Sequence, residues 1–87
     1  MIDELLQLRG KVDRVDDQIL NALKERTEIC RSIGSIKKEN GIPVKDLYRE
    51  GEIFERIREK AKGFSLDPER VEAVFREIVI MCSAVQE

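Results

Sequence analysis

Residues 5–36, LLQLRGKVDRVDDQILNALKERTEICRSIGSI, decide the fold of this 87-residue chain. Apolar side chains recur along this stretch at alternating spacings of three and four, which is the period of one face of a helix. Nine of the ten positions in this seam are apolar: Leu5, Leu8, Val12, Val15, Ile19, Ala22, Ile29, Ile33 and Ile36. The pattern predicts a long helix that packs against other helices through this seam.

The tenth position of the seam holds a charged residue, Arg26. Burying a lone guanidinium in apolar surroundings is very costly, so an anion is expected to meet it there. That anion is either a carboxylate of the protein or a bound ligand, and the sequence pattern alone does not decide between them.

The composition is typical of a small helical domain and excludes several classes of function. Charged residues make up 39 % of the chain and aromatic residues 5 %, with no His or Trp and a formal net charge of −2. This balance gives no case for nucleic-acid binding, and no stretch approaches the roughly 20 apolar residues of a membrane span. The first residues lack the features of a signal peptide, so we expect a cytoplasmic protein. Cys30 and Cys82 lack metal-site spacing, and we expect free thiols.

Start and stop signals divide the chain into three expected helices, at about residues 3–39, 46–63 and 67–87. Asp46 and Asp67 are good N-cap residues, and Pro68 suits the first turn of the third helix. Gly41 suits the left-handed residue that follows a helix. We therefore predict an all-α fold, one long helix and two shorter ones, in a single domain over residues 1–87.

The length of the first helix has a consequence for assembly. About 36 residues of helix extend about 54 Å, whereas a compact domain of this size has a radius of gyration of roughly 12 Å. The two short helices cannot cover a seam of that length. We expect a second copy to cover the rest, which gives an intertwined homodimer. The alternative is a kink near Gly34 that folds the helix back on itself.

Two cations share one face of the first helix. Arg26 and Lys37 are eleven residues apart, so they differ by about 20° around the axis and by about 16 Å along it. Gly34 and Ser35 lie between them and would leave space above the backbone. Together these residues predict the cationic floor of a pocket. The alternative for Lys37 is a solvated charge at the end of the helix.

The other two helices carry further polar candidates. Asp46, Arg49 and Glu50 fall on one face, although Asp46 could simply cap the helix while Arg49 and Glu50 form a solvated pair. Gln86 ends an otherwise apolar row of the third helix and can both donate and accept hydrogen bonds. Its alternative is a frayed terminal residue.

Arg9 lies 28 residues from Lys37, roughly 42 Å along the same helix. One small ligand cannot touch both residues in the same chain. In an antiparallel dimer, however, Arg9 of one chain could approach Arg26 and Lys37 of the other. The alternative is an ordinary surface arginine.

The ordered set of these residues resembles the all-α chorismate mutases, the AroQ class. The resemblance covers nearly the whole chain, and its segments are Leu8-Arg9, Lys11-Val12, Asp16, Glu25-Arg26, Gly34, Lys37, Pro43-Val44-Lys45-Asp46, Arg49-Glu50 and Gln86. It implies the rearrangement of chorismate, a dianion, to prephenate in phenylalanine and tyrosine biosynthesis. This Claisen rearrangement passes through a chair-like transition state and implies no cofactor and no metal.

The resemblance also implies a role for each residue. Arg26, with Arg9 of the partner subunit, would bind the two carboxylates of the substrate. Lys37 and Gln86 would donate to the ether oxygen, where negative charge grows as the bond breaks. These roles make Arg26, Lys37 and Gln86 the expected catalytic residues.

Further residues would hold the ring. Glu50 would accept from the ring hydroxyl, assisted by the backbone N–H of Asp46, and Arg49 would support the edge of the site. Cys82 stands where some relatives carry a hydroxyl that helps to bind a carboxylate, and a thiol is a weaker donor. Two more residues would line the wall: Val79 and Ser83.

Two other functions remain open from the sequence. An isochorismate pyruvate lyase shares this fold and a similar site, although Glu50 and Gln86 favour the mutase. A non-catalytic or partner-dependent helical dimer would need no cationic pocket. We expect a monofunctional enzyme, because the chain has no room for a second catalytic domain.

Overall fold

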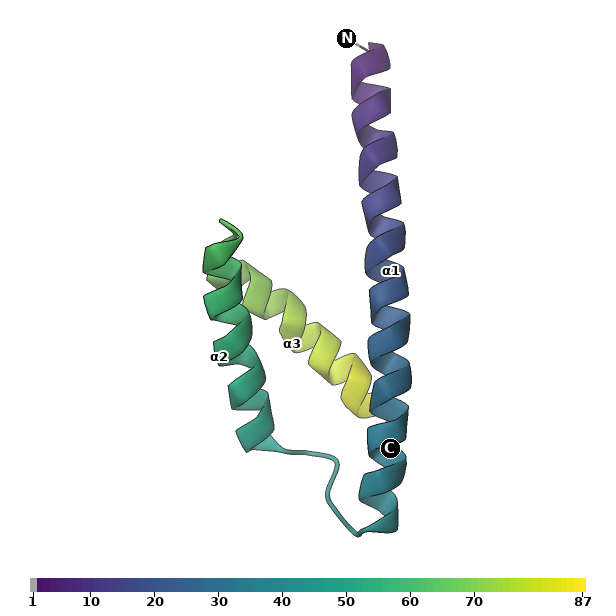
Figure 1. Cartoon of the computed structure of the whole chain (residues 1–87), viewed down its shortest axis with the longest axis vertical. Helices are drawn as coiled ribbons and strands as arrows, with labels where there is room; N and C mark the ends of the chain where they lie inside the picture. The colour runs from purple at the N-terminus through teal and green to yellow at the C-terminus, as the bar shows by residue number, and fades with distance from the viewer. Residues whose placement is uncertain (1) are drawn as a thin grey trace.

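The computed structural model describes residues 2–87, which form three α-helices with no strand between them. These are α1 (Ile2–Glu39), α2 (Leu47–Gly63) and α3 (Pro68–Ala84). The predicted all-α fold, with a long first helix and two shorter ones, is confirmed. α1 runs straight and unbroken over 38 residues, so the alternative of a kink near Gly34 is wrong (Figure 1).

The helix ends follow the local signals in the sequence. Asp46 precedes α2, and its carboxylate accepts a hydrogen bond from the backbone N–H of Arg49 at 3.0 Å. Asp67 caps α3 in the same way, accepting from the N–H of Glu69 at 3.0 Å. Gly41 takes the left-handed conformation after α1, with φ of 65°. Side-chain caps of this kind satisfy N–H groups that have no partner inside the helix.

The third helix is shorter than predicted. α3 ends at Ala84, whereas the sequence predicted helix to the end of the chain. The backbone N–H of Gln86 bonds to the carbonyl of Ser83 at 3.1 Å, a spacing of three residues that tightens the last turn. Gln86 therefore lies in a turn beyond the helix.

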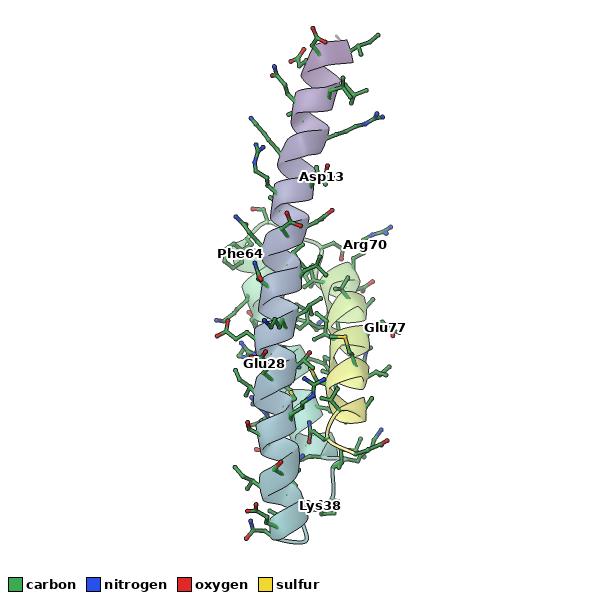
Figure 2. All side chains as sticks on the ribbon, turned by 90° about the vertical axis from the view of Figure 1, so that its right-hand side faces the viewer. Asp13, Glu28, Lys38, Phe64, Arg70 and Glu77 are labelled. Atoms are coloured by element: carbon green, nitrogen blue, oxygen red, sulfur yellow. The ribbon has the colours of Figure 1, made fainter. Side chains whose placement is uncertain are left out.

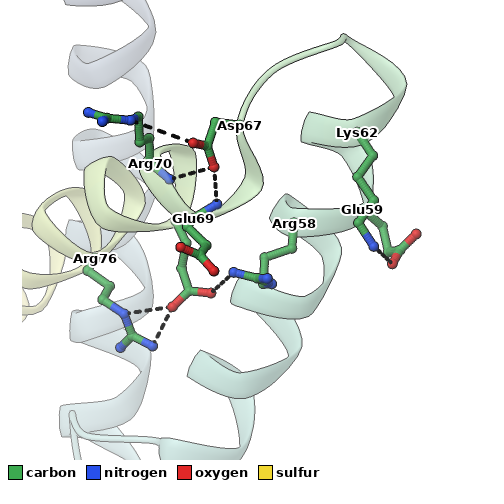
Figure 3. Close-up of polar contacts among 8 residues, drawn as sticks. Arg58, Glu59, Lys62, Asp67, Glu69, Arg70 and Arg76 are labelled. Atoms are coloured by element: carbon green, nitrogen blue, oxygen red, sulfur yellow. Dashed lines mark hydrogen bonds and ion pairs between the residues drawn. The ribbon is translucent and has the colours of Figure 1, made fainter.

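The apolar core lies between α2 and α3. Ile53, Phe54 and Ile57 of α2 pack on Val79 of α3. The same two helices are joined by an ion pair between Arg58 of α2 and Glu72 of α3, and Arg76 of α3 donates to the same carboxylate. Figure 3 draws Arg58 and Arg76 with dashed lines to this carboxylate. α3 then runs diagonally from α2 to α1, so that its C-terminal end meets α1 (Figure 1).

α2 and α3 leave most of the α1 seam exposed, as the length of α1 predicted. In α1 the buried residues are Cys30 and Gly34, each one position after a seam residue. Leu8 and Val12 remain 51 % and 58 % exposed. The molecule measures 58 × 24 × 15 Å, with a radius of gyration of 16.5 Å. A compact chain of this length would have about 12 Å, so a long apolar face stands free. No helix in residues 2–87 has the length and apolar character needed to cross a membrane.

Candidate active site

A cavity of about 280 Å³ lies among the three helices and the loop that joins α1 to α2. Nine of the ten residues predicted for the site line it: Arg26, Lys37, Asp46, Arg49, Glu50, Val79, Cys82, Ser83 and Gln86. Residues far apart in the sequence are thus brought together around one space.

Six further residues line this cavity and were not predicted as site residues: Ile29, Cys30, Ile33, Val44, Ile53 and Arg56. Arg56 follows Arg49 by two helical turns and therefore lies on the same face of α2, a signal that could have found it. The apolar members carry no such signal, because their pattern is also that of core residues. With Arg56 included, four cationic side chains and two carboxylates line the cavity, so it has a positive balance.

Arg26 is half-buried on α1 and is not neutralised within the chain. Its Nη1 lies 3.9 Å from the Cys30 Sγ, a weak contact with an uncharged thiol. None of the ion pairs found in residues 2–87 involves Arg26. Of the two anions that the sequence left open, a bound ligand is therefore favoured over a carboxylate of the same chain.

Lys37 lies near the end of α1 and faces the loop that leads to α2. Its Nζ donates to the carbonyl of Val44 at 2.8 Å, and the side chain is half-buried. None of the ion pairs found in residues 2–87 involves Lys37 either. The alternative of a solvated end charge is wrong, because the ammonium holds the loop and faces the cavity. An ammonium has three N–H donors, so the contact with Val44 leaves others for a ligand.

The three polar residues at the start of α2 make different contacts. Asp46 caps the helix, as described above. Arg49 reaches Glu52 at 3.5 Å on the exposed side, so the suggested pair of Arg49 with Glu50 is not formed. Glu50 is half-buried and lines the cavity without an ion pair among residues 2–87. It presents an acceptor to whatever occupies the space.

Gln86 is half-buried rather than frayed. Its Nε2 donates to the carbonyl of Cys82 at 3.3 Å, while its Oε1 is buried with no partner among the described residues. The space predicted above Gly34 is filled by Gln86, and Gly34 itself is buried. The expectation that Gly34 forms part of the pocket floor is therefore wrong. The glycine instead allows the end of the chain to rest on α1.

Cys30 and Cys82 are free thiols, as predicted, and the structure shows that both are buried. Burial is the main cause that raises the pKa of the Cys30 thiol, and a hydrogen bond with the Cys82 thiol raises it further. The charges of Arg26 and Lys37 act in the opposite direction. Among residues 2–87, no cluster of three or more His, Cys, Asp or Glu side chains is arranged to hold a metal ion.

Arg9 is the predicted site residue that the chain does not bring to the cavity. It is exposed on α1, about 26 Å along the helix from Arg26. Figure 2 shows that the N-terminal part of α1, around Asp13, extends beyond α2 and α3 with its side chains free. Arg9 could reach a cavity of this kind only in another copy of the chain.

Comparisons with known proteins show which family this chain is similar to. The family model described as chorismate mutase type II matches residues 8–87. The chain is 32 % identical to the chorismate mutase of Methanocaldococcus jannaschii, over its whole length and 88 % of that protein. It is 34 % identical to the bifunctional chorismate mutase/prephenate dehydratase of Aquifex aeolicus, but spans only 25 % of that protein. A solved structure, a conserved hypothetical protein from Pyrococcus furiosus, is 35 % identical with a TM-score of 0.73, over 95 % of each chain.

Proposed function

The chain belongs to the chorismate mutase type II family, and we propose that it catalyses the rearrangement of chorismate to prephenate. One observation carries the proposal more than any other. Arg26 and Lys37 face a cavity in which no carboxylate of the described chain pairs with either of them. Two unpaired cations beside Glu50 and Gln86 suit a small dianion that also carries a hydroxyl and an ether oxygen.

Binding of the substrate follows from these charges. The planar guanidinium of Arg26 can donate two parallel hydrogen bonds to one carboxylate. We assign the second carboxylate to Arg9 of the partner subunit, with Lys37 close to it. Arg26 and Lys37 are both half-buried, and neither forms an ion pair among residues 2–87, so no ion pair of the described chain has to break when an anion binds.

The rate acceleration would come from donors aimed at the ether oxygen. As the ether bond breaks, negative charge grows on this oxygen, and Lys37 and Gln86, which both line the cavity, can supply N–H groups to it. Fixed donors that meet charge as it develops stabilise the transition state more than the ground state. No proton transfer, nucleophile or metal is needed for this rearrangement.

The rest of the cavity would hold the flexible substrate in its compact form. Glu50 accepts from the ring hydroxyl, assisted by the N–H of Asp46, while Arg49 supports the edge. Val79 and Ser83 line the wall, and the thiol of Cys82 donates only weakly to a carboxylate. Holding both ends of the rearranging system close together removes part of the entropic barrier.

The proposed enzyme is an intertwined homodimer. The seam of α1 is half exposed over its N-terminal length, from Leu8 at 51 % to Ile19 at 52 %. A second copy running antiparallel would cover this apolar face and bring its Arg9 toward the cavity. A cytoplasmic location stays a prediction.

The test is to follow chorismate consumption by ultraviolet absorbance and to identify the product by NMR, without added metal or cofactor. We expect prephenate from the wild-type protein. Arg26→Ala should lower kcat/KM by about a hundredfold to a thousandfold, equivalent to roughly 3–4 kcal/mol of lost stabilisation. Arg31→Ala is the matched control, because Arg31 is an exposed arginine of the same helix outside the cavity.

The other outcomes point to the alternatives. When isochorismate is supplied in place of chorismate, formation of pyruvate and an aromatic acid would assign a lyase instead of a mutase. No turnover by folded, dimeric protein would assign a non-catalytic or partner-dependent module. An Arg26→Ala enzyme with near-normal turnover would remove Arg26 from the site even if prephenate formed.

A further inference from the structure

The C-terminal turn crosses α1 at one glycine. A Cβ built on Gly34 would lie 2.7 Å from the Cα of Gln86 and 3.0 Å from both its Cβ and its carbonyl oxygen. Real Cβ atoms essentially never approach another heavy atom closer than 3.0 Å. The corresponding Cβ on Gly10 or Gly51, also within helices, would meet nothing within 4 Å. At Gly34, unlike at Gly10 and Gly51, the backbone of the helix lies directly against the backbone of Gln86.

The residue that lies against Gly34 is Gln86, which we propose donates a hydrogen bond to the ether oxygen of the substrate. Gln86 follows the end of α3, is tied to Ser83 through its backbone N–H, and turns its side chain toward the cavity. Lys37, the second donor, lies three residues after Gly34 on α1, about 4.5 Å along the axis. The contact at Gly34 therefore helps to fix the distance between a donor on α1 and a donor in the turn after α3.

We propose that Gly34 is a positioning residue that seats Gln86 beside Lys37. The proposal rests on the function proposed above, in which Gln86 donates to the ether oxygen. A side chain at position 34 would meet main-chain atoms of Gln86, which cannot rotate away as a flexible side chain can. To reach the 3.4 Å at which ordinary contact begins, the turn would have to move about 0.7 Å from its 2.7 Å separation. Displacements near 1 Å can reduce turnover about a hundredfold.

The glycine is otherwise unfavourable at this place. Glycine in the middle of a helix is less stable than alanine, so Gly34→Ala should strengthen α1 locally. Circular dichroism should therefore find the variant folded and helical. A loss of turnover in a folded, helical variant would separate positioning from stability.

The experiment compares Gly34→Ala with Gly51→Ala, which makes the same chemical change in α2 in open space. For Gly34→Ala we expect kcat to fall roughly tenfold to a hundredfold with a smaller change in KM, because Arg26 still binds the substrate. Gly51→Ala should keep the wild-type kcat. Wild-type kcat in Gly34→Ala, or an unfolded Gly34→Ala chain, would overturn the proposal.

A double variant tests whether Gly34 acts through Gln86. In a Gln86→Ala background the amide is already gone, so adding Gly34→Ala should lower kcat little further. A full additional loss in that background would assign Gly34 a general structural role and overturn the proposal. The side-chain amide signal of Gln86 in the nitrogen–proton NMR spectrum gives a readout that needs no activity. It should shift in Gly34→Ala while the signals of Gln7 and Gln18 stay unchanged.

These readouts distinguish the two proposals. If the wild-type protein forms no prephenate, the proposed function fails, yet the NMR shift still tests the contact. If wild type and Gly51→Ala are both active and Gly34→Ala equals them, the function stands and the positioning proposal fails.

Discussion

Gln86 offers an uncharged amide where a carboxylate of similar size would also fit. An ionised carboxylate would oppose the negative charge that grows on the ether oxygen, and only its protonated form could donate there. We predict that the kcat of the wild-type enzyme changes little between about pH 6 and 8, whereas the kcat of Gln86→Glu rises as pH falls toward the range in which a glutamate takes up a proton.

The measurement for this prediction is a set of pH–rate profiles. Gln86→Ala is the control, because it has neither a donor nor a titrating group at this position and should be slow at every pH. Wild-type turnover that climbs steeply below neutral pH would contradict the assignment of Gln86. So would a Gln86→Glu profile parallel to that of the wild type.

A second prediction at the residue scale concerns the reactivity of the Cys30 thiol. Burial raises the pKa of this thiol, the contact with Cys82 adds to it, and only the thiolate reacts with alkylating reagents. At about pH 8 iodoacetamide should therefore modify Cys30 much more slowly in the folded protein than in denaturant, with a rate that rises at higher pH than for a free cysteine. Peptide mass spectrometry measures this, and equal rates in the two states would contradict it.

Most of the residues that line the cavity could be predicted from the sequence, but not the contacts that they make. Arg26 stands out because it interrupts an apolar seam, and that rule applies in any helix packing. The role of Gly34 was predicted wrongly, because Gly34 contacts Gln86, which lies 52 residues later in the chain. No local spacing in the sequence indicates a contact of this range. Arg49 was paired with the wrong glutamate because i,i+1 neighbours point in different directions, whereas Glu52 lies one turn away.

At the scale of elements, α2 and α3 are joined by a charged cluster whose strength depends on pH. Glu72 accepts from Arg76 at 2.7 Å and 2.9 Å and from Arg58 at 3.2 Å, and its side chain is 19 % exposed. Arg76 also lies 4.3 Å from the centre of the Phe54 ring. The hydrogen bond from Arg76 is the main cause that lowers the pKa of Glu72, with Arg58 adding to it.

A lowered pKa in the folded state stabilises the fold above the unfolded pKa and loses this effect as pH falls through the folded pKa. We predict that Glu72→Gln lowers Tm at pH 7 and that the difference from wild type shrinks below the ordinary range of a glutamate. Thermal unfolding at several pH values measures this. Glu77→Gln, an exposed glutamate of the same helix, should show no such trend. A deficit in Glu72→Gln that persists unchanged in acid would contradict the ionic origin.

Element boundaries were the most predictable part of the fold because their causes are local. A capping side chain acts within three residues, so Asp46 and Asp67 could be recognised without any tertiary information. The end of α3 was predicted less well because it carries no glycine or proline signal after Ala84. The turn there lies against Gly34 of α1, and a contact between residues so far apart in the sequence has no local signal.

At the scale of the molecule, the length of α1 and its apolar pattern together predict an exposed seam, which neither feature predicts alone. A seam of α1 longer than two short helices can cover predicts a partner, and Leu8 and Val12 are indeed more than half exposed in the single chain. The identity and direction of that partner do not follow from one chain. They depend on where Arg9 acts, which a mixture of two inactive variants can establish.

Arg9→Ala and Arg26→Ala should each be nearly inactive as homodimers, because every site lacks one arginine. In a mixed dimer, one site takes Arg26 from the Arg9→Ala chain and Arg9 from the Arg26→Ala chain, and is intact. The other site lacks both. Random pairing of equal amounts makes about half of the dimers mixed, so refolding the two variants together should restore about a quarter of wild-type activity. Arg9→Ala refolded with Lys37→Ala should recover similarly, whereas Arg26→Ala with Lys37→Ala should not, because those residues act in the same chain. No recovery in the first mixture would mean that Arg9 does not cross to a partner's site.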